Sequence, residues 1–211
     1  MRALLTSAVA GYERKDAVYR RAKREGFRSR AAIKLEELDR LFSLLRPGQR
    51  VVDLGCWPGG WLQVCADRVG ARGRVVGVDV AETQQIERPN VVVLNADVYA
   101  DGLVQRVRDA LGGPADLLLS DLAPKMSGIA ASDSARHAAL VHRALDLARA
   151  LLAPDGIFLA KLFMDAEYQG LIQEIRGTFA AVKARKLDTT RKGSSELYVC
   201  GRGLKGAVPP T

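Results

Sequence analysis

A glycine-rich stretch, DLGCWPGGW at residues 53–61, combines residue types that could hold a small ligand. Its glycines and Pro58 predict a tight turn that brings bare backbone close to that ligand. The spacing fits neither the dinucleotide pattern G-x-G-x-x-G nor the phosphate-binding pattern G-x-x-x-x-G-K-[ST]. The turn therefore favours a ligand that needs no phosphate anchor.

Acidic residues stand at or near the ends of four successive apolar runs: Asp53, Asp79, Asp97 and Asp121. A carboxylate accepts two hydroxyl hydrogen bonds, so Asp79 suits a ribose diol. Asp97 suits the amino group of adenine or the amino end of a ligand. A compact ligand with ribose, adenine and an amino-acid tail fits these groups, and we interpret it as S-adenosylmethionine. The alternative for any one of these acids is a helix cap.

Two lysines occupy positions where the pattern calls for apolar residues. Lys34 lies in a helical pattern, and Lys161 lies inside the strand-like run LAKLF. A buried lysine is unfavourable unless it is paired or has a function. Both lysines are therefore candidates for chemistry, and the alternative is that they form ordinary buried ion pairs.

Alternating strand-like and helix-like segments position these residues from residue 50 onwards. The strand-like segments are residues 50–55, 74–80, 90–98, 115–124, 156–163, 182–187 and 196–201, and the helix-like segments are residues 60–69, 101–111, 134–152 and 166–179. Near-continuous apolar strands predict an α/β fold with a mostly parallel sheet and helices on both faces. In such sheets the ligand lies at the carboxyl ends of the strands, where the four acids are.

Residues 15–45 precede the sheet and predict two helices that are broken near Gly26, with Ser29 as the N-cap of the second helix. We expect one domain in this chain of 211 residues. It would comprise a basic helical segment (1–49), a Rossmann-like core (50–203) and a tail (204–211).

The net charge of +8 is unevenly distributed along the chain. Residues 1–50 carry +7, residues 51–175 carry −5 and residues 176–211 carry +6. Basic segments that meet on one face suit a nucleic acid, which is bound largely through phosphate contacts. The alternative is a basic surface that contacts only solvent.

Three cysteines and two histidines are too few for a disulfide framework or a zinc site. No stretch has the length of a membrane span, and the first 15 residues do not resemble a secretory signal. We expect a cytoplasmic protein without a metal or a membrane partner, and a monomer.

Five motifs occur in order along the chain: FRSRAAIKL (27–35), DLGCWPGGW (53–61), SDLAPKMSG (120–128), LAKLF (159–163) and SSELYV (194–199). Together they resemble the FtsJ/RrmJ-type ribosomal RNA 2′-O-methyltransferases over about residues 15–203. The resemblance implies a class I methyltransferase fold with seven strands, the last of them antiparallel. It also implies S-adenosylmethionine as cofactor and, as target, a uridine in the A-loop of 23S ribosomal RNA within the large subunit.

The catalytic residues of this family are a Lys-Asp-Lys-Glu tetrad. By motif match the tetrad falls on Lys34, Asp121, Lys161 and Glu196. The cofactor positions fall on Gly59, Trp61, Asp79, Asp97 and Asp121, and Gly55 and Gly60 belong to the same glycine turn.

Methyl transfer to a ribose hydroxyl needs the oxygen in line with the methyl and the sulfur, and a route for the hydroxyl proton. Lys161 is the candidate base, although an unperturbed lysine with a pKa of about 10.4 is protonated at neutral pH. Asp121 and Glu196 would stabilise its ammonium form, whereas Lys34, the cofactor's positive sulfur and burial would disfavour it. Two roles stay open: Lys161 is neutral and acts as base, or it is charged and steers the oxygen while the proton leaves late.

Cys56 and Trp57 depart from the usually small residues that follow the first glycine of this turn in the family. Trp57 either packs outward or narrows the cofactor entrance. Cys56 is expected to be a small buried hydrophobic residue, because no histidine is placed by motif to activate it as a nucleophile.

Basic residues flank the tetrad in sequence, and the candidates for RNA binding are Arg20, Arg21, Lys23, Arg24, Arg28, Arg30, Arg185, Lys186, Arg191 and Lys192. Aromatic residues make up only 6% of the chain, so shape and phosphate contacts to a folded RNA are favoured over base stacking. One alternative is a tRNA or cap 2′-O-methyltransferase with the same tetrad. Another is a non-catalytic RNA-binding factor in ribosome assembly, against which the intact tetrad argues.

Overall fold

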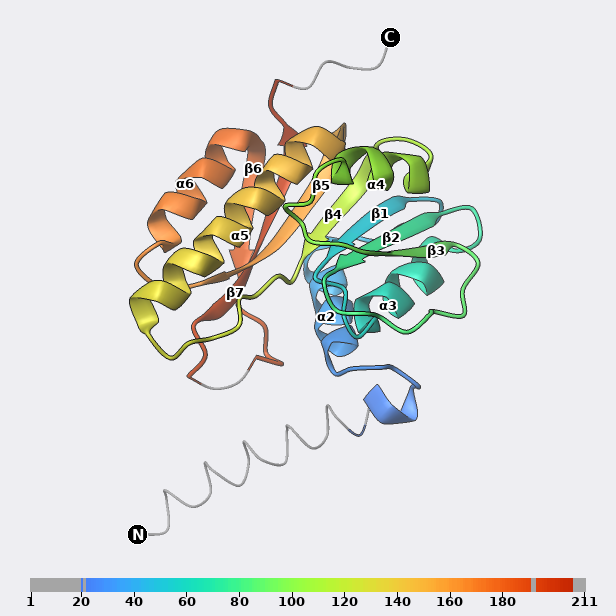
Figure 1. The fold of residues 1–211 in the computed structure, drawn as a ribbon, viewed down its shortest axis with the longest axis horizontal. Coiled ribbons are helices and arrows are strands. Elements are labelled where there is room, and N and C mark those ends of the chain that lie inside the picture. The colour runs from blue at the N-terminus through green and yellow to red at the C-terminus, as the bar shows by residue number, and fades with distance from the viewer. Residues whose placement is uncertain (1–19, 21, 191–192, 207–211) are drawn as a thin grey trace.

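The computed structural model describes residue 20 and residues 22–190 and 193–206. Its centre is a seven-stranded sheet with the order β3-β2-β1-β4-β5-β7-β6 (Figure 1). The strands are β1 (Arg50–Leu54), β2 (Arg74–Asp79), β3 (Val91–Asn95), β4 (Ala115–Ser120), β5 (Leu152–Phe163), β6 (Phe179–Arg185) and β7 (Glu196–Leu204).

All strands of the sheet run in one direction except β7. Strand β1 pairs in parallel with β2 and β4, β2 with β3, and β4 with β5, whereas β7 is antiparallel to both β5 and β6. The predicted α/β class, the mostly parallel sheet and the antiparallel last strand are confirmed. The carboxyl ends of β1 to β5 meet at one edge of the sheet, so the residues that follow these strands are brought together there.

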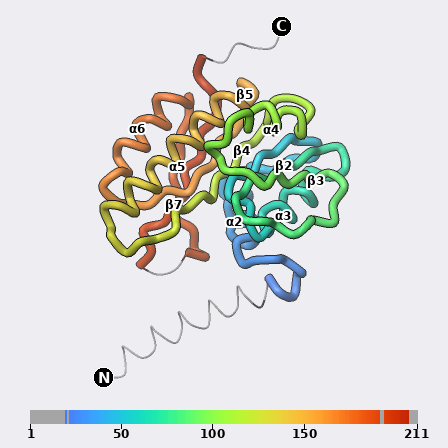
Figure 2. Tube along the Cα trace, in the orientation of Figure 1, coloured from blue at the N-terminus to red at the C-terminus, as the bar shows by residue number. Residues whose placement is uncertain are grey.

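Helices cover both faces of this sheet, as predicted. They are α2 (Ala31–Phe42), α3 (Gly60–Val69), α4 (Leu103–Leu111), α5 (Ala130–Leu151) and α6 (Tyr168–Thr178). Helices α2 and α3 share one hydrophobic cluster, and α4, α5 and α6 share the cluster on the opposite face (Figures 1 and 2).

Side-chain alternation along β5 decides which face each residue serves. Ile157 and Leu159 pack in the cluster of α2 and α3, whereas Phe158 and Ala160 pack in the cluster of the other three helices. Lys161 continues the first series, so its side chain belongs to the face that α2 covers.

Several predicted boundaries are wrong where a strand directly follows a helix. Strand β5 begins at Leu152, immediately after α5, because Leu152 pairs with Ala115 before a register shift. Strand β6 likewise begins at Phe179, immediately after α6, and Leu204 is the last residue of β7 instead of part of the tail. Pro154, Asp155 and Gly156 are typical turn residues, but they lie inside β5 at its register shift from β4, so they predict a strand start that is too late.

The predicted N-cap at Ser29 is also wrong. Helix α2 begins after Arg30, which occupies the cap position, and no side chain caps it. The Ser29 hydroxyl is instead buried, without a hydrogen-bond partner, beside Gly60 at the start of α3. Of the first predicted helix, residues 22–24 are helical, and residues 1–19 and 21 lie outside the described residues.

Candidate active site

The turn after β1 approaches the turn after β4 closely at Gly55. Gly55 has a φ of 81°, and a Cβ at this position would lie 3.2 Å from the backbone nitrogen of Leu122 and 3.3 Å from the carbonyl carbon of Asp121. A glycine therefore allows the two turns to lie against each other at the carboxyl edge of the sheet.

These turns border a cavity of about 640 Å³. It is lined by Gly55, Trp57, Val78, Asp79, Val80, Ala81, Ala96, Asp97, Val98, Tyr99, Asp121, Leu122, Ala123, Pro124, Arg136, Ala139 and Leu140. Four of the predicted cofactor residues, Gly55, Asp79, Asp97 and Asp121, thus line one space. A largely apolar cavity of this size with a few polar groups is typical of small-molecule sites.

The two acids after β2 and β3 are held in place by backbone donors. The Asp79 carboxylate accepts hydrogen bonds from the Trp57 amide at 2.8 Å and the Ala81 amide at 2.8 Å, one on each oxygen. One oxygen of Asp97 accepts from the Tyr99 amide at 2.9 Å. A carboxylate has about four acceptor positions, so both acids keep capacity for hydroxyl or amino groups of a ligand.

Trp57, Val80 and Tyr99 form an apolar part of the cavity wall that is also open to solvent. Their exposed fractions are 59%, 68% and 53%. Of the two possibilities for Trp57, the structure therefore places the indole in the wall of the cavity, more than half exposed. Exposed apolar residues that share a cavity are typical of a surface that a ligand covers.

The other three predicted cofactor residues lie elsewhere: Gly60 and Trp61 face the start of α2, and Gly59 faces Ile86 and Arg28. A Cβ on Gly59 would lie 2.7 Å from the Ile86 side chain, and a Cβ on Gly60 would meet Ser29. Trp61 is buried and donates its indole N–H to the Ala31 carbonyl at 2.8 Å. These three residues are not in the cavity lining, and their contact with a cofactor stays a prediction.

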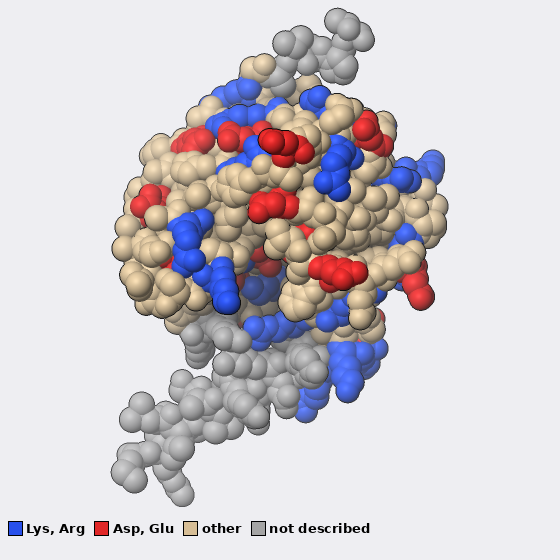
Figure 3. Space-filling model, in the orientation of Figure 1, with Lys and Arg blue, Asp and Glu red and all other residues tan. Residues whose placement is uncertain are grey.

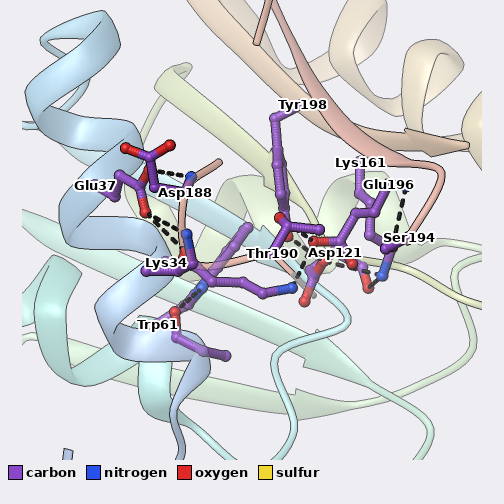
Figure 4. Close-up of polar contacts among 12 residues, drawn as sticks. Lys34, Glu37, Trp61, Asp121, Lys161, Asp188, Thr190, Ser194, Glu196 and Tyr198 are labelled. Atoms are coloured by element: carbon purple, nitrogen blue, oxygen red, sulfur yellow. Dashed lines mark hydrogen bonds and ion pairs between the residues drawn. The ribbon is translucent and has the colours of Figure 1, made fainter. Parts of the chain in front are cut away.

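The first half of the predicted tetrad is an ion pair beside this cavity, and its lysine is buried. Lys161 Nζ lies 3.0 Å from Asp121 Oδ1, and it donates to the Asp121 backbone carbonyl, also at 3.0 Å (Figure 4). The Lys161 side chain is only 8% exposed. Asp121 lines the cavity as well, so one residue belongs to both arrangements.

The second half is an ion pair between α2 and β7. Lys34 Nζ lies 2.6 Å from Glu196 Oε1, and the Thr190 hydroxyl lies 3.4 Å from the same oxygen (Figure 4). In the β5–β7 ladder, Lys161 is paired with Tyr198 and Phe163 with Glu196. Because alternate residues share a face, Glu196 and Lys161 are on the same face of the sheet. The structure thus brings together all four tetrad residues, from α2, β5, β7 and the end of β4.

Tyr198 connects the two pairs and was not predicted as a site residue. Its hydroxyl donates to Asp121 Oδ1 at 3.1 Å, and its ring centroid lies 5.9 Å from Lys34 Nζ. Burial raises the pKa of Tyr198 well above its ordinary value, and Asp121 and Glu196 add to this effect. Tyr198 therefore stays a hydrogen-bond donor. The signal in the sequence was its position two residues after Glu196, on the same strand face.

Two further buried groups lie behind the site. Asp53 is fully buried, and neither of its carboxylate oxygens has a hydrogen-bond partner. Burial raises its pKa well above the ordinary value, and the negative charges of Asp121 and Asp79 add to this. His137 packs on Phe163 with 4.5 Å between ring centroids, and burial, with a contribution from Lys161, lowers its pKa to about 4. His137 is therefore neutral down to about pH 4, and burial favours the neutral form of Asp53.

The predicted RNA-binding residues differ in their surroundings. Lys23, Arg24, Arg30, Arg185 and Lys186 are exposed, and Lys and Arg side chains gather on the side of the molecule where the chain enters α2 (Figure 3). Arg20 is exposed and has an interaction of its own. Arg21, Arg191 and Lys192 lie outside the described residues.

Arg28 is engaged with the protein itself. Its guanidinium donates to the carbonyls of Gln84 and Gln85 at 2.6 and 2.5 Å, which ties the segment before α2 to the segment after β2. Its predicted contact with RNA stays a prediction, and its observed contacts are structural.

The remaining chemistry-bearing residues do not form a second centre within the described residues. Cys56, Cys65 and Cys200 are free and buried, and burial raises the pKa of each thiol. In the described part of the chain, no group of three or more His, Cys, Asp or Glu residues is arranged to hold a metal ion. No helix formed by the described residues combines the length and apolar character that crossing a membrane requires.

Comparison with known proteins identifies a family and close relatives. Residues 27–204 match the model of the FtsJ-like methyltransferase family. The chain is 47% identical over 190 residues to the ribosomal RNA large subunit methyltransferase E of Halobacterium salinarum, over 90% of this chain and 73% of that protein. It is 43% identical over 194 residues to the protein of the same name from Syntrophobacter fumaroxidans, over 92% and 98% of the two chains.

A solved structure shares the fold at lower identity. The crystal structure of a candidate ribosomal RNA methyltransferase from Plasmodium falciparum superposes with a TM-score of 0.74 at 24% identity, over 84% of this chain and 98% of that one. This likeness shows the common fold.

Proposed function

The chain belongs to the FtsJ-like methyltransferase family, and on that premise we propose that it methylates a ribose 2′-hydroxyl of ribosomal RNA in the large subunit, with S-adenosylmethionine as donor. The relatives named ribosomal RNA large subunit methyltransferase E support this substrate. The observation that carries the proposal is the double position of Asp121, which lines the cavity and pairs with Lys161. A cofactor space and a lysine able to control a hydroxyl proton thus share one residue.

The residues of the cavity fit this cofactor. Asp79 would hold the ribose hydroxyls and Asp97 the adenine amino group, since both carboxylates keep free acceptor positions. Gly55 leaves room beside the backbone of the turn. Gly60 and Trp61 would support this turn from the side of α2, and Gly59 from the side of Ile86. When bound, S-adenosylmethionine supplies an electrophilic methyl group.

The residues around Lys161 would position the ribose hydroxyl. The Lys161 ammonium donates to the Asp121 carbonyl and forms an ion pair with the Asp121 carboxylate. An ammonium has three donors, so Lys161 keeps capacity for a lone pair of the hydroxyl oxygen, which would orient the other lone pair toward the methyl group. Lys34 is already neutralised by Glu196, so it does not oppose the charge on Lys161. In this arrangement Lys161 would steer the oxygen, and the hydroxyl proton would leave late, to solvent water.

We further propose that the enzyme acts as a cytoplasmic monomer and that its target is a uridine of the A-loop. The test is transfer of labelled methyl groups to unmodified large subunits, free 23S RNA and bulk tRNA, followed by nuclease digestion. Label on a 2′-O-methylated uridine from the subunits is expected. Label only on tRNA would overturn the substrate, and no transfer to any acceptor by protein that binds the cofactor would favour the assembly-factor alternative.

A further inference from the structure

The connection between β6 and β7 leads directly into the tetrad residue Glu196. Its described residues are 186–190 and 193–195. Leu187 is 4% exposed and belongs to the hydrophobic cluster that contains Leu35 and Leu38 of α2. The connection is therefore packed against the same helix that carries Lys34.

Glu37 binds this connection through its carboxylate. One oxygen accepts a hydrogen bond from the Asp188 amide at 2.7 Å (Figure 4). The other oxygen accepts from the Thr189 hydroxyl at 2.7 Å and from the Thr189 amide at 3.3 Å. Hydrogen bonds from backbone donors to an ionised carboxylate are stronger than those between neutral groups. The partners are more than 150 residues apart in sequence, so these bonds fix tertiary structure.

Glu37 and Lys34 act on the connection at two neighbouring points. The two residues are three positions apart on α2, so their side chains emerge on one side of the helix. Glu37 holds Asp188 and Thr189, and Lys34 holds Glu196 at the end of the connection. Between these points the Thr190 hydroxyl lies 3.4 Å from the Glu196 carboxylate. The placement of Glu196 against Lys34 thus depends on where the connection is docked.

Glu37 does not itself bind RNA phosphates, because its side chain is negatively charged. Arg185, the last residue of β6, and Lys186, the first residue of the connection, are exposed, and Lys186 Nζ donates to the Ser194 carbonyl at 2.6 Å. An anionic side chain beside them would weaken phosphate binding unless its charge were directed elsewhere. Both of its oxygens are directed at backbone and hydroxyl donors of the connection. Glu37 is suited to hold the basic segment in place while its own charge is compensated.

We propose that Glu37, with Thr189, is a positioning residue for the RNA substrate: it docks the β6–β7 connection on α2 so that Arg185 and Lys186 face the RNA and Glu196 meets Lys34. This proposal rests on the proposed RNA methyltransferase function. The cofactor cavity has no lining residue in α2 or in the connection. Loss of the Glu37 contacts should therefore weaken binding of the RNA and leave the affinity for the cofactor unchanged.

The experiment compares the full-length protein with Glu37→Ala, Thr189→Val and a control, Asp67→Ala. Asp67 is an acid on α3 whose ion pair with Arg88 is about half exposed, so the control removes a surface acid away from the connection. We measure KM and kcat with unmodified large subunits, the Kd of S-adenosylmethionine by calorimetry, and hydrogen exchange of the Asp188 and Thr189 amides.

For Glu37→Ala we expect KM for the subunits to rise by roughly tenfold or more, because hydrogen bonds to a charged group are lost. Thr189→Val removes the hydroxyl hydrogen bond and keeps the hydrogen bond from the backbone amide, so it should raise KM by only about threefold. The Kd of the cofactor should stay within about twofold for all variants. Exchange at the two amides should accelerate in Glu37→Ala and not in Asp67→Ala.

Two results would overturn the proposal. One is an unchanged KM in Glu37→Ala despite faster amide exchange, which would make the contact purely structural. The other is a cofactor Kd that weakens as much as KM rises, which would mean general destabilisation. Failure of the proposed function is distinguishable, since the unaltered protein would then methylate no RNA while the exchange difference persisted.

Discussion

The two lysine–carboxylate pairs of the site have the same chemistry and different supports. Lys161 and Asp121 belong to adjacent strands or their ends, with exposed fractions of 8% and 23%. Lys34 and Glu196 come from α2 and from the start of β7, with exposed fractions of 20% and 14%. The first pair is fixed by the sheet, whereas the second depends on how a helix and a connection dock. The sheet therefore fixes the pair of Lys161 and Asp121 in advance. The pair of Lys34 and Glu196 forms only when α2 and the β6–β7 connection are docked, so we expect it to be the pair that contacts with the substrate can influence.

Removal of the lysine that the sheet supports should cause the largest loss of activity. Lys161→Ala should reduce kcat by roughly 10²–10⁴-fold, the range for a group that controls a proton in the transition state. The Kd for S-adenosylmethionine should change little, because Lys161 does not line the cavity. Single-turnover methylation and calorimetry measure the two quantities. Near-normal turnover would refute the tetrad assignment.

Removal of the assembled pair should have a smaller effect. Glu196→Ala should reduce kcat by roughly 10- to 100-fold, since it removes one charged contact and leaves Lys34 partly hydrated. A double-mutant cycle with Lys34→Ala should show that the two losses are not additive, because both variants break the same contact. Fully additive losses would mean that the pair does not act as a unit.

A substitution in the cavity should change the affinity for the cofactor and not the rate of methyl transfer. Asp79→Ala should weaken S-adenosylmethionine binding by roughly tenfold, the typical loss for a hydrogen bond to a charged group. The kcat at saturating cofactor should be kept. Glu82→Ala is a suitable control, because Glu82 is an exposed acid close in sequence that does not line the cavity. Equal affinities of the two variants in calorimetry would remove Asp79 from the ribose site.

His137, beside the first pair, should make the stability of the protein depend on pH. His137 lies beside Lys161, Asp165 and Asp121, and burial lowers its pKa from 6.5 to about 4. The unfolded chain binds a proton on this residue below pH 6.5 that the folded chain does not bind until about pH 4. Stability should therefore fall as the pH drops through this window, by at most about 1.4 kcal/mol per pH unit.

His137→Leu should remove this contribution, which melting temperatures between pH 8 and pH 4.5 would show. Parallel curves for the variant and the unaltered protein would mean that the imidazole is not held neutral in the fold. A Glu174→Gln variant serves as a control, because the imidazole of His142 beside it is half exposed.

Much of the fold could be predicted because its strands are short apolar runs bounded by acids and glycines. The prediction failed at the start of β5, because the turn residues Pro154, Asp155 and Gly156 lie inside the strand at its register shift. It also failed at the start of β6, because Phe179 follows α6 without an intervening loop. The prediction of Ser29 as the N-cap of α2 failed for a different reason. Ser29 has the right residue type, but its hydroxyl is taken into the contact with Gly60.

The site could be predicted to the extent that motifs and strand ends mark it. The resemblance located the tetrad, and the strand ends located Asp79, Asp97 and Asp121. The orientation of Gly60 and Trp61 toward α2 could not be predicted, because a turn between a strand and a helix offers contacts on two sides. Glu37 carries no signal of its own, since its partners are backbone groups more than 150 residues away.

We propose that ribose methylation of ribosomal RNA depends on the pair of Lys161 and Asp121 beside the cavity. The most direct measurement compares the unaltered protein with Lys161→Ala in transfer of labelled methyl groups to unmodified large subunits. Nuclease digestion then locates the label. We expect a 2′-O-methylated nucleotide with the unaltered protein and almost none with the variant, at equal cofactor occupancy. Label on a base instead of a ribose, or equal transfer by both proteins, would contradict this proposal.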